Sequence, residues 1–173
     1  NSLSLSRRLT LSFALLLLLL AAVAGLGLYR MSQIQASLEN IAYVNNEQAR
    51  LAVKMRISIN QVATATRNVV LIEDDAGMAA EMERLKQARQ RYDEADKALE
   101  VAFQHPSTTP EEKALFAKIR ELRATTRPLI DKVLSLALKN DNSTAREVLL
   151  REVTGPQGDW LHALGDLADL ETS

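Results

Sequence analysis

The segment from Leu9 to Tyr29 constrains this chain more than any other, because it reads LTLSFALLLLLLAAVAGLGLY and carries no charge. Its length of about 21 residues is enough to cross the ~30 Å hydrocarbon core of a bilayer as an α-helix. The sequence therefore predicts a single transmembrane helix over residues 9–29, preceded by a short arm over residues 1–8.

Charges on both sides of this segment predict its orientation. Arg7 and Arg8 stand before it, whereas only Arg30 follows directly after it. Because cytoplasmic flanks carry the excess of basic residues, the N-terminus is expected in the cytoplasm. We therefore expect an inner-membrane protein with residues 30–173 in the periplasm.

A cleaved signal peptide is the alternative interpretation of the apolar segment. Such peptides have an apolar core of ~7–15 residues that ends at a small-residue site. Ala21, Ala22, Ala24 and Gly25 resemble such a site, but the apolar run is longer than a signal peptide needs. Helical periodicity resumes directly after Arg30, which favours an uncleaved anchor.

Composition narrows the class of protein. The ~140 residues after the anchor are enough for one domain with a core of its own. With 21 Lys and Arg against 22 Asp and Glu, no basic excess points to nucleic acid. The absence of cysteine excludes disulfides, thiolate metal sites and Cys nucleophiles, and it fits an oxidising compartment. Ala, Leu, Glu, Arg and Gln dominate, which predicts an all-α fold.

The first helix after the anchor is predicted over residues 31–73, where Pro and Gly are absent. Along it, a seam of residues recurs at alternating spacings of three and four, as in a heptad repeat. The seam consists of Leu38, Ile41, Asn45, Gln48, Ala52, Met55, Ile59, Val62, Thr66 and Val69. Small or apolar residues flank this seam, so the face is wide enough to bury against more than one neighbour, including a second copy of the chain.

Three further helices are predicted over residues 76–104, 110–139 and 144–171. Asp74 or Asp75 is expected to cap the first of them. Thr109, Pro110 and Glu112 form a capping-box start for the next. Pro128 predicts a bend near residues 124–127, and the segment 154–159, TGPQGD, predicts a kink or a short break in the last helix.

Four long helices with short turns predict an antiparallel up-down-up-down four-helix bundle after the transmembrane helix. An even number of helices returns the chain to the membrane. A second membrane span is therefore expected after Ser173, as in a fragment of a longer receptor.

This organisation resembles the four-helix-bundle ligand-binding domain of bacterial methyl-accepting chemotaxis receptors. The resemblance is carried by SLSRRLTLSFALLLLLL, by INQVATATRNVVLIEDD and by AREVLLREVTGPQGDWLHALGDLADLE. It implies a homodimer that binds a small ligand near the membrane-distal part of the bundle, often across the dimer interface. A shift of the fourth helix would then act on a cytoplasmic kinase and its coupling protein.

Two alternatives remain open at this point. The same module also precedes histidine kinases and cyclases, so the output of the receptor is not defined by the bundle. A membrane-tethered helical spacer without a ligand is the other alternative.

Arg56 is the first candidate for ligand binding, because it occupies a flank position that is elsewhere small or apolar. A guanidinium held there needs a partner, and its fork geometry suits a carboxylate. In register with the aspartate-type receptors, Arg56 falls on a ligand arginine, whereas Gln61 and Ala65 fall on the two further arginines of that pattern. The resemblance therefore does not reproduce an aspartate site. The alternative is an arginine that reaches solvent or pairs with an acid of the neighbouring subunit.

The other candidates lie on all four predicted helices. They are Asn60, Arg67, Arg89, Tyr92, Thr126, Arg127 and Thr154. Arg67 is equally consistent with a solvated surface residue, and Tyr92 and Trp160 with core residues. We predict a small organic anion, such as a di- or tricarboxylate or an aromatic acid, held by Arg56 with help from Arg67 or Arg89.

Catalytic chemistry is not expected. His105 and His162 are the only histidines and belong to different turns. The sequence has no HExxH, GxSxG or P-loop motif and no spacing of acids typical of a metal site. We therefore expect a binding protein without a metal or cofactor.

Overall fold

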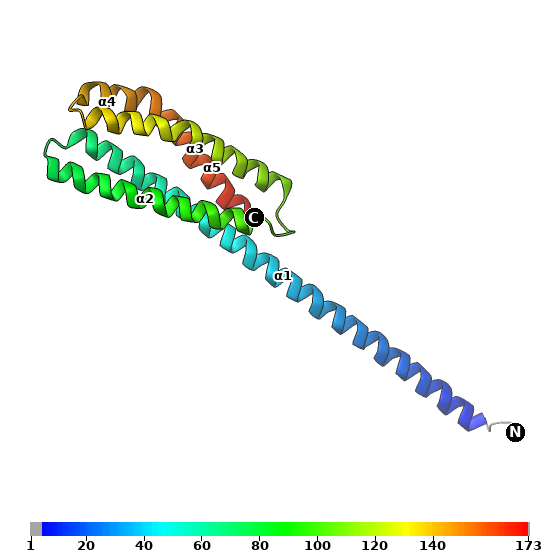
Figure 1. Cartoon of the computed structure of the whole chain (residues 1–173). Coiled ribbons are helices and arrows are strands. Elements are labelled where there is room, and N and C mark those ends of the chain that lie inside the picture. The colour runs from blue at the N-terminus through cyan, green and yellow to red at the C-terminus, as the bar shows by residue number, and fades with distance from the viewer. Residues whose placement is uncertain (1–4, 173) are drawn as a thin grey trace. The chain divides into compact units, whose positions relative to one another are not determined.

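The computed structural model describes the backbone of residues 5–172 and the side chains of residues 13–35 and 42–172 (Figure 1). Every regular element in this part of the chain is helical, which confirms the predicted all-α class. The chain divides into two compact units, Asn1–Tyr43 and Val44–Ser173. Each unit is described by itself.

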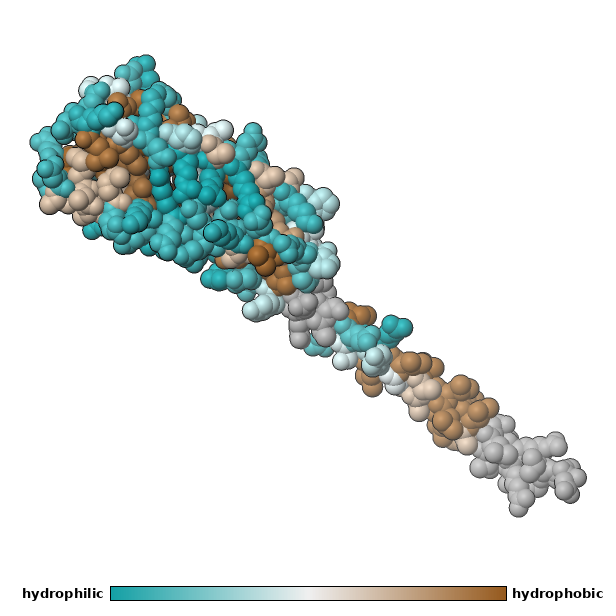
Figure 2. All heavy atoms as spheres, in the orientation of Figure 1, coloured by the Kyte–Doolittle hydropathy of each residue, from teal (hydrophilic) through white to brown (hydrophobic). Residues whose placement is uncertain are grey.

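The first unit consists of the N-terminal part of helix α1, which spans Leu5–Leu71. Among the described residues, Phe13–Gln35 is the only segment long and apolar enough to cross a membrane, with a mean hydropathy of 2.1. None of its side chains is buried, and Figure 2 shows hydrophobic residues along this segment. The segment overlaps the predicted span 9–29, of which the side chains of residues 9–12 lie outside the described part. An apolar helix of this kind indicates membrane anchoring.

The second unit is a bundle of four helical rods that lie side by side (Figure 1). The rest of α1 forms the first rod, α2 (Asp75–Ala102) the second and α3 (Pro110–Ala137) the third. The fourth rod consists of α4 (Asn142–Val148), the π-helix η1 (Leu149–Val153) and α5 (Thr154–Leu170). The predicted bounds are close except at the start of the first helix, because the anchor and the first rod form one continuous helix.

The predicted seam of the first rod faces the core. Of the seam residues whose side chains are described, all but the partly buried Asn45 are fully buried. They are Gln48, Ala52, Met55, Ile59, Val62, Thr66 and Val69. Leu38 and Ile41 lie outside the described side chains.

Side-chain caps start the helices as the sequence predicts. Asp74 accepts a hydrogen bond of 2.7 Å from the Gly77 amide at the start of α2. At the start of α3 the Thr109 hydroxyl accepts from the Glu112 amide, and the Glu112 carboxylate accepts from the Thr109 amide at 2.6 Å. These caps satisfy amide groups that have no partner within the helix.

The predicted irregularity of the fourth rod lies earlier than expected. Residues 154–159 are α-helical, and the wide π-turn η1 precedes them. Pro156 lacks an amide hydrogen, and its ring would collide with the carbonyl four residues back in a regular helix. We infer that the wider turn relieves this collision. Pro128 lies inside α3 without ending it, and the bend near residues 124–127 stays a prediction.

The core of the bundle consists of two hydrophobic clusters. One contains Met55, Tyr92 and Trp160, and the other contains Val69, Val133 and Val153. Two buried polar residues lie where the clusters meet along the third and fourth rods. These are Thr126 and Gln157, which we call the mid-bundle layer.

Candidate functional site

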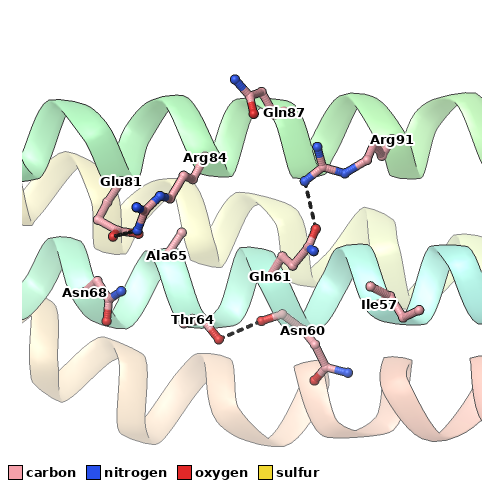
Figure 3. Close-up of a pocket in the computed structure, with 10 residues that line it drawn as sticks. All are labelled: Ile57, Asn60, Gln61, Thr64, Ala65, Asn68, Glu81, Arg84, Gln87 and Arg91. Carbon is pink, nitrogen blue, oxygen red and sulfur yellow. Dashed lines mark hydrogen bonds and ion pairs between the residues drawn. The ribbon is translucent and has the colours of Figure 1, made fainter.

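A groove of about 410 Å³ runs between the first two rods, and we call it the α1–α2 groove (Figure 3). Its volume falls within the range of ~300–1,000 Å³ that is usual for small-molecule sites. The lining residues are Ile57, Asn60, Gln61, Thr64, Ala65 and Asn68 from α1 and Glu81, Arg84, Gln87 and Arg91 from α2.

Arg91 is the distinctive residue of this groove. Its side chain is partly buried, and Nη2 donates a hydrogen bond of 2.8 Å to Oε1 of Gln61 (Figure 3). Within the described chain no carboxylate lies within ion-pair distance of Arg91. A guanidinium bonded only to a neutral amide keeps its charge available for an anion.

The other end of the groove is formed by an ion pair. Nη1 of Arg84 lies 2.6 Å from Oε1 of Glu81, whose side chain is only 8% exposed. Figure 3 shows Arg84 turned toward Glu81, whereas Arg91 reaches toward Gln61. The amide side chains and Ala65 give the remaining wall no charge of its own.

Arg56 and Arg67 do not line the groove, although both were predicted to hold the ligand. Of the two interpretations of Arg56, the structure agrees with the arginine that reaches solvent, because its side chain is exposed. Its guanidinium lies over Gly165 of α5, where an added Cβ would meet Nη1 at 3.5 Å. The missing side chain at Gly165 leaves room for Arg56 to cross α5 toward solvent. A role for Arg56 or Arg67 in ligand binding stays a prediction.

Arg89 and Arg127 belong to a series of ion pairs between the second and third rods, which we call the α2–α3 ladder. Arg89 lies 2.6 Å from Asp131, and Arg127 lies 3.1 Å from Asp93. The remaining pairs are Arg123–Asp93, Arg123–Asp96, Arg120–Asp96 and Arg120–Glu100. These arginines already have acidic partners, so an incoming anion would have to displace a carboxylate.

Tyr92 is a core residue with a satisfied hydroxyl oxygen. It is 1% exposed, and it accepts a hydrogen bond of 3.1 Å from Nε1 of Trp160. The two rings meet edge to face, with centroids 5.1 Å apart. Burial raises the pKa of the Tyr92 hydroxyl above its ordinary value.

The two threonines among the predicted ligand residues have different environments. Thr126 is fully buried, and its hydroxyl has no hydrogen-bond partner in the described structure. Thr154 is exposed and donates a hydrogen bond of 2.9 Å to the Leu149 carbonyl, across the π-turn. Its hydroxyl therefore serves the local helix geometry.

The structure gathers the predicted residues in two places. Asn60 is the one that lines the α1–α2 groove. Arg89, Tyr92 and Arg127 meet around an enclosed cavity of only about 10 Å³ inside the bundle, which has room for about one water molecule. Arg91 was not predicted. Its signal was its position one heptad after Arg84, since the two arginines directly precede Leu85 and Tyr92, which are buried on α2.

No group of three or more His, Cys, Asp or Glu side chains in the described chain is placed to hold a metal ion. His105 bonds to Ser107 within its turn at 2.7 Å, and His162 is exposed on α5.

Residues 2–173 match the sequence model of the four-helix-bundle sensory module for signal transduction. The chain belongs to this family. The match covers the anchor and the whole bundle, and it agrees with the resemblance on which the fold was predicted. No curated protein and no solved structure matches the chain. The chain is thus a four-helix-bundle sensory module with a role in signal transduction.

Proposed function

We propose that this chain is the ligand-sensing part of a transmembrane chemoreceptor and binds a small organic anion in the α1–α2 groove. The observation that carries this proposal is the guanidinium of Arg91, which is partly buried in a groove of about 410 Å³ and bonded only to a neutral amide. Carboxylates match the fork of donors on a guanidinium, so an organic acid is the best-suited ligand.

The bundle lies on the periplasmic side of the inner membrane. The apolar segment Phe13–Gln35 supplies the anchor. Arg7 and Arg8 before it, against Arg30 near its end, support a cytoplasmic N-terminus.

A second copy of the chain is the expected partner of α1. Val53, Ile57 and Leu71 are exposed on this helix and alternate with polar residues at spacings of three and four. This outward stripe is a second heptad pattern beside the buried seam. Because Ile57 also lines the groove, a partner helix along the stripe would close the open side of the ligand site.

The ligand acts by shifting the balance between two packings of the bundle. The free energy by which the ligand shifts this balance equals the difference between its binding free energies for the two packings. The fourth rod carries this shift toward a second span and then to a cytoplasmic kinase and coupling protein. A histidine kinase or a cyclase as the output module would use the same first steps.

Binding to the full chain in lipid nanodiscs tests the proposal. A thermal-shift and calorimetry panel of organic acids, amino acids and inorganic anions is expected to give a carboxylate hit, because a ligand of the folded state raises the melting temperature. Arg91→Gln removes the charge of the guanidinium and keeps a polar amide side chain, and it is expected to weaken binding at least tenfold. Arg151→Gln, at a side chain that is 79% exposed on the fourth rod, is the matched control. Unchanged affinity in Arg91→Gln would refute the assignment.

The ligand-free spacer is the second candidate, and the α2–α3 ladder favours it. The four arginines of this ladder pair with acids of the same chain, as in a purely structural protein. A panel without any hit in the full chain would support the spacer over the sensor.

A further inference from the structure

One end of the bundle contains a buried cluster of polar side chains that ligand binding in the α1–α2 groove does not use. We call it the proximal polar cluster, and it consists of Gln48, Thr108, Glu112 and Glu171. All four are less than a tenth exposed, with values of 0%, 7%, 6% and 4%. They come from α1, the α2–α3 connection, α3 and the end of α5, so every rod but the second contributes a side chain.

Three members of this cluster make hydrogen bonds, and Gln48 and Thr108 bond to each other. Nε2 of Gln48 donates to the Thr108 hydroxyl at 3.2 Å and to the Ala102 carbonyl at 3.1 Å. The neighbouring amide of Thr109 donates to the Glu112 carboxylate at 2.6 Å. The side-chain amide of Gln48 and the Thr109 amide are therefore already committed as donors.

Glu171 has no such donor. Both of its carboxylate oxygens are buried, and neither has a hydrogen-bond partner within the described chain. Oε1 of Gln48 is likewise buried without a partner. The cluster thus contains two buried acceptor groups without a donor. A buried carboxylate without a donor is costly, whereas a protonated one supplies the missing donor itself.

The charged groups near Glu171 also favour the protonated form of its carboxyl. Burial and the nearby Glu112 carboxylate raise the pKa of Glu171 to about 7. On α1 the charged groups near this level are Glu47 and Arg50, which are exposed and bonded to each other at 2.6 Å. The ring of His105 in the connection bonds to Ser107. Glu112 on α3 is therefore the charge that acts on Glu171.

We propose that Glu171 binds a proton in the proximal polar cluster and that this proton keeps the end of α5 packed against α3. When the proton leaves, the Glu171 side chain turns toward water and the last turn of α5 loosens. Glu171 is the C-cap residue of α5, so its release frees the end of the fourth rod. Ambient pH would thereby bias the same rod that the proposed sensor uses, without any ligand in the groove.

Carboxyl titration by NMR tests proton binding directly. The full chain, labelled with ¹³C at glutamate and held in nanodiscs, is titrated from acid to alkaline pH. We expect one glutamate to titrate near pH 7, and Glu171→Gln to remove that titration. Glu121→Gln, at an exposed position of α3, is the matched control and should leave it in place. A titration near pH 7 that survives Glu171→Gln, or the absence of any glutamate that titrates there, would overturn the proposal.

A distance measurement tests the coupling to α5. The chain has no cysteine, so Gln104→Cys and Asp169→Cys place two spin labels at exposed positions on the α2 end and on α5. The distance distribution is expected to broaden as the pH rises through 7, and to stay narrow when Glu171→Gln is added. A distribution that does not change with pH, or that changes equally with Glu171→Gln, overturns the coupling.

Discussion

Trp160 donates a hydrogen bond of 3.1 Å from Nε1 to the hydroxyl of Tyr92, and this pair links the fourth rod to the second inside the core. Both side chains are nearly inaccessible, with exposures of 2% and 1%. An indole N–H that loses its acceptor in such a place stays without water. The pair therefore stabilises the bundle by more than the contact area of its two rings.

Tyr92→Phe is expected to lower the free energy of unfolding by ~1–3 kcal/mol, because it leaves the Trp160 donor unsatisfied while it keeps the ring. Urea unfolding followed by tryptophan fluorescence measures this, since Trp160 is the only tryptophan. Tyr43→Phe is the control, because Tyr43 is 74% exposed and should change stability little. Equal effects of the two substitutions would contradict a buried hydrogen bond.

Asp96 anchors the α2–α3 ladder and gives a second prediction. Its side chain is 7% exposed and lies 3.1 Å from Arg120 and 3.2 Å from Arg123. Asp96→Asn leaves these guanidinium groups near a neutral amide, so we expect a loss of ~1–3 kcal/mol in the free energy of unfolding. The loss should shrink at high salt, because both arginines are partly exposed.

Glu147→Gln serves as the comparison for this ladder. It removes the ion pair with Arg151 on the surface of the fourth rod, where both side chains are more than half exposed. Exposed pairs of this kind contribute ~0.5 kcal/mol or less. If Asp96→Asn lowered the free energy of unfolding no more than Glu147→Gln, the ladder would contribute no more to stability than an exposed surface ion pair.

The sequence was sufficient to predict what depends on local chemistry and periodicity. Asp74 and the pair Thr109–Glu112 cap their helices as predicted, because a cap needs only residues within one turn. The seam from Gln48 to Val69 is buried because a heptad repeat specifies which face meets the neighbouring rods. The number of rods follows from the same periodicity and from the short turns between the predicted helices.

Arginine environments were not predictable in the same way. Arg56 and Arg91 both occupy positions beside a buried seam, yet one crosses Gly165 to solvent and the other enters a groove. The difference depends on which residue the neighbouring rod places opposite each guanidinium. Periodicity within one helix contains no information about that register between helices.

The mid-bundle layer gives a third prediction through Thr126. Its hydroxyl is buried without a hydrogen-bond partner in the described structure. On folding it therefore loses its hydrogen bonds to water, and no bond within the protein replaces them. Thr126→Val keeps the shape and removes this cost, and we expect the free energy of unfolding to rise by up to ~1 kcal/mol. Thermal unfolding of the full chain in nanodiscs measures the change, with exposed Thr125→Val as control. A loss of stability would indicate a partner for the hydroxyl, such as a bound molecule.

Arg84 and Arg91 lie seven residues apart on the groove side of α2, which corresponds to ~10 Å along the helix axis. If the groove binds an organic anion, Arg91 is expected to provide most of the affinity, because Arg84 shares its charge with Glu81. Arg84 still has free donors on its fork, so a dicarboxylate that reaches both groups should bind more tightly than a monocarboxylate of the same length.

Calorimetry with matched linear mono- and dicarboxylates measures this preference. Arg84→Gln should abolish the preference and leave monocarboxylate binding unchanged, whereas Arg91→Gln should weaken both. A preference that survives Arg84→Gln would mean that the second carboxylate lies elsewhere in the groove.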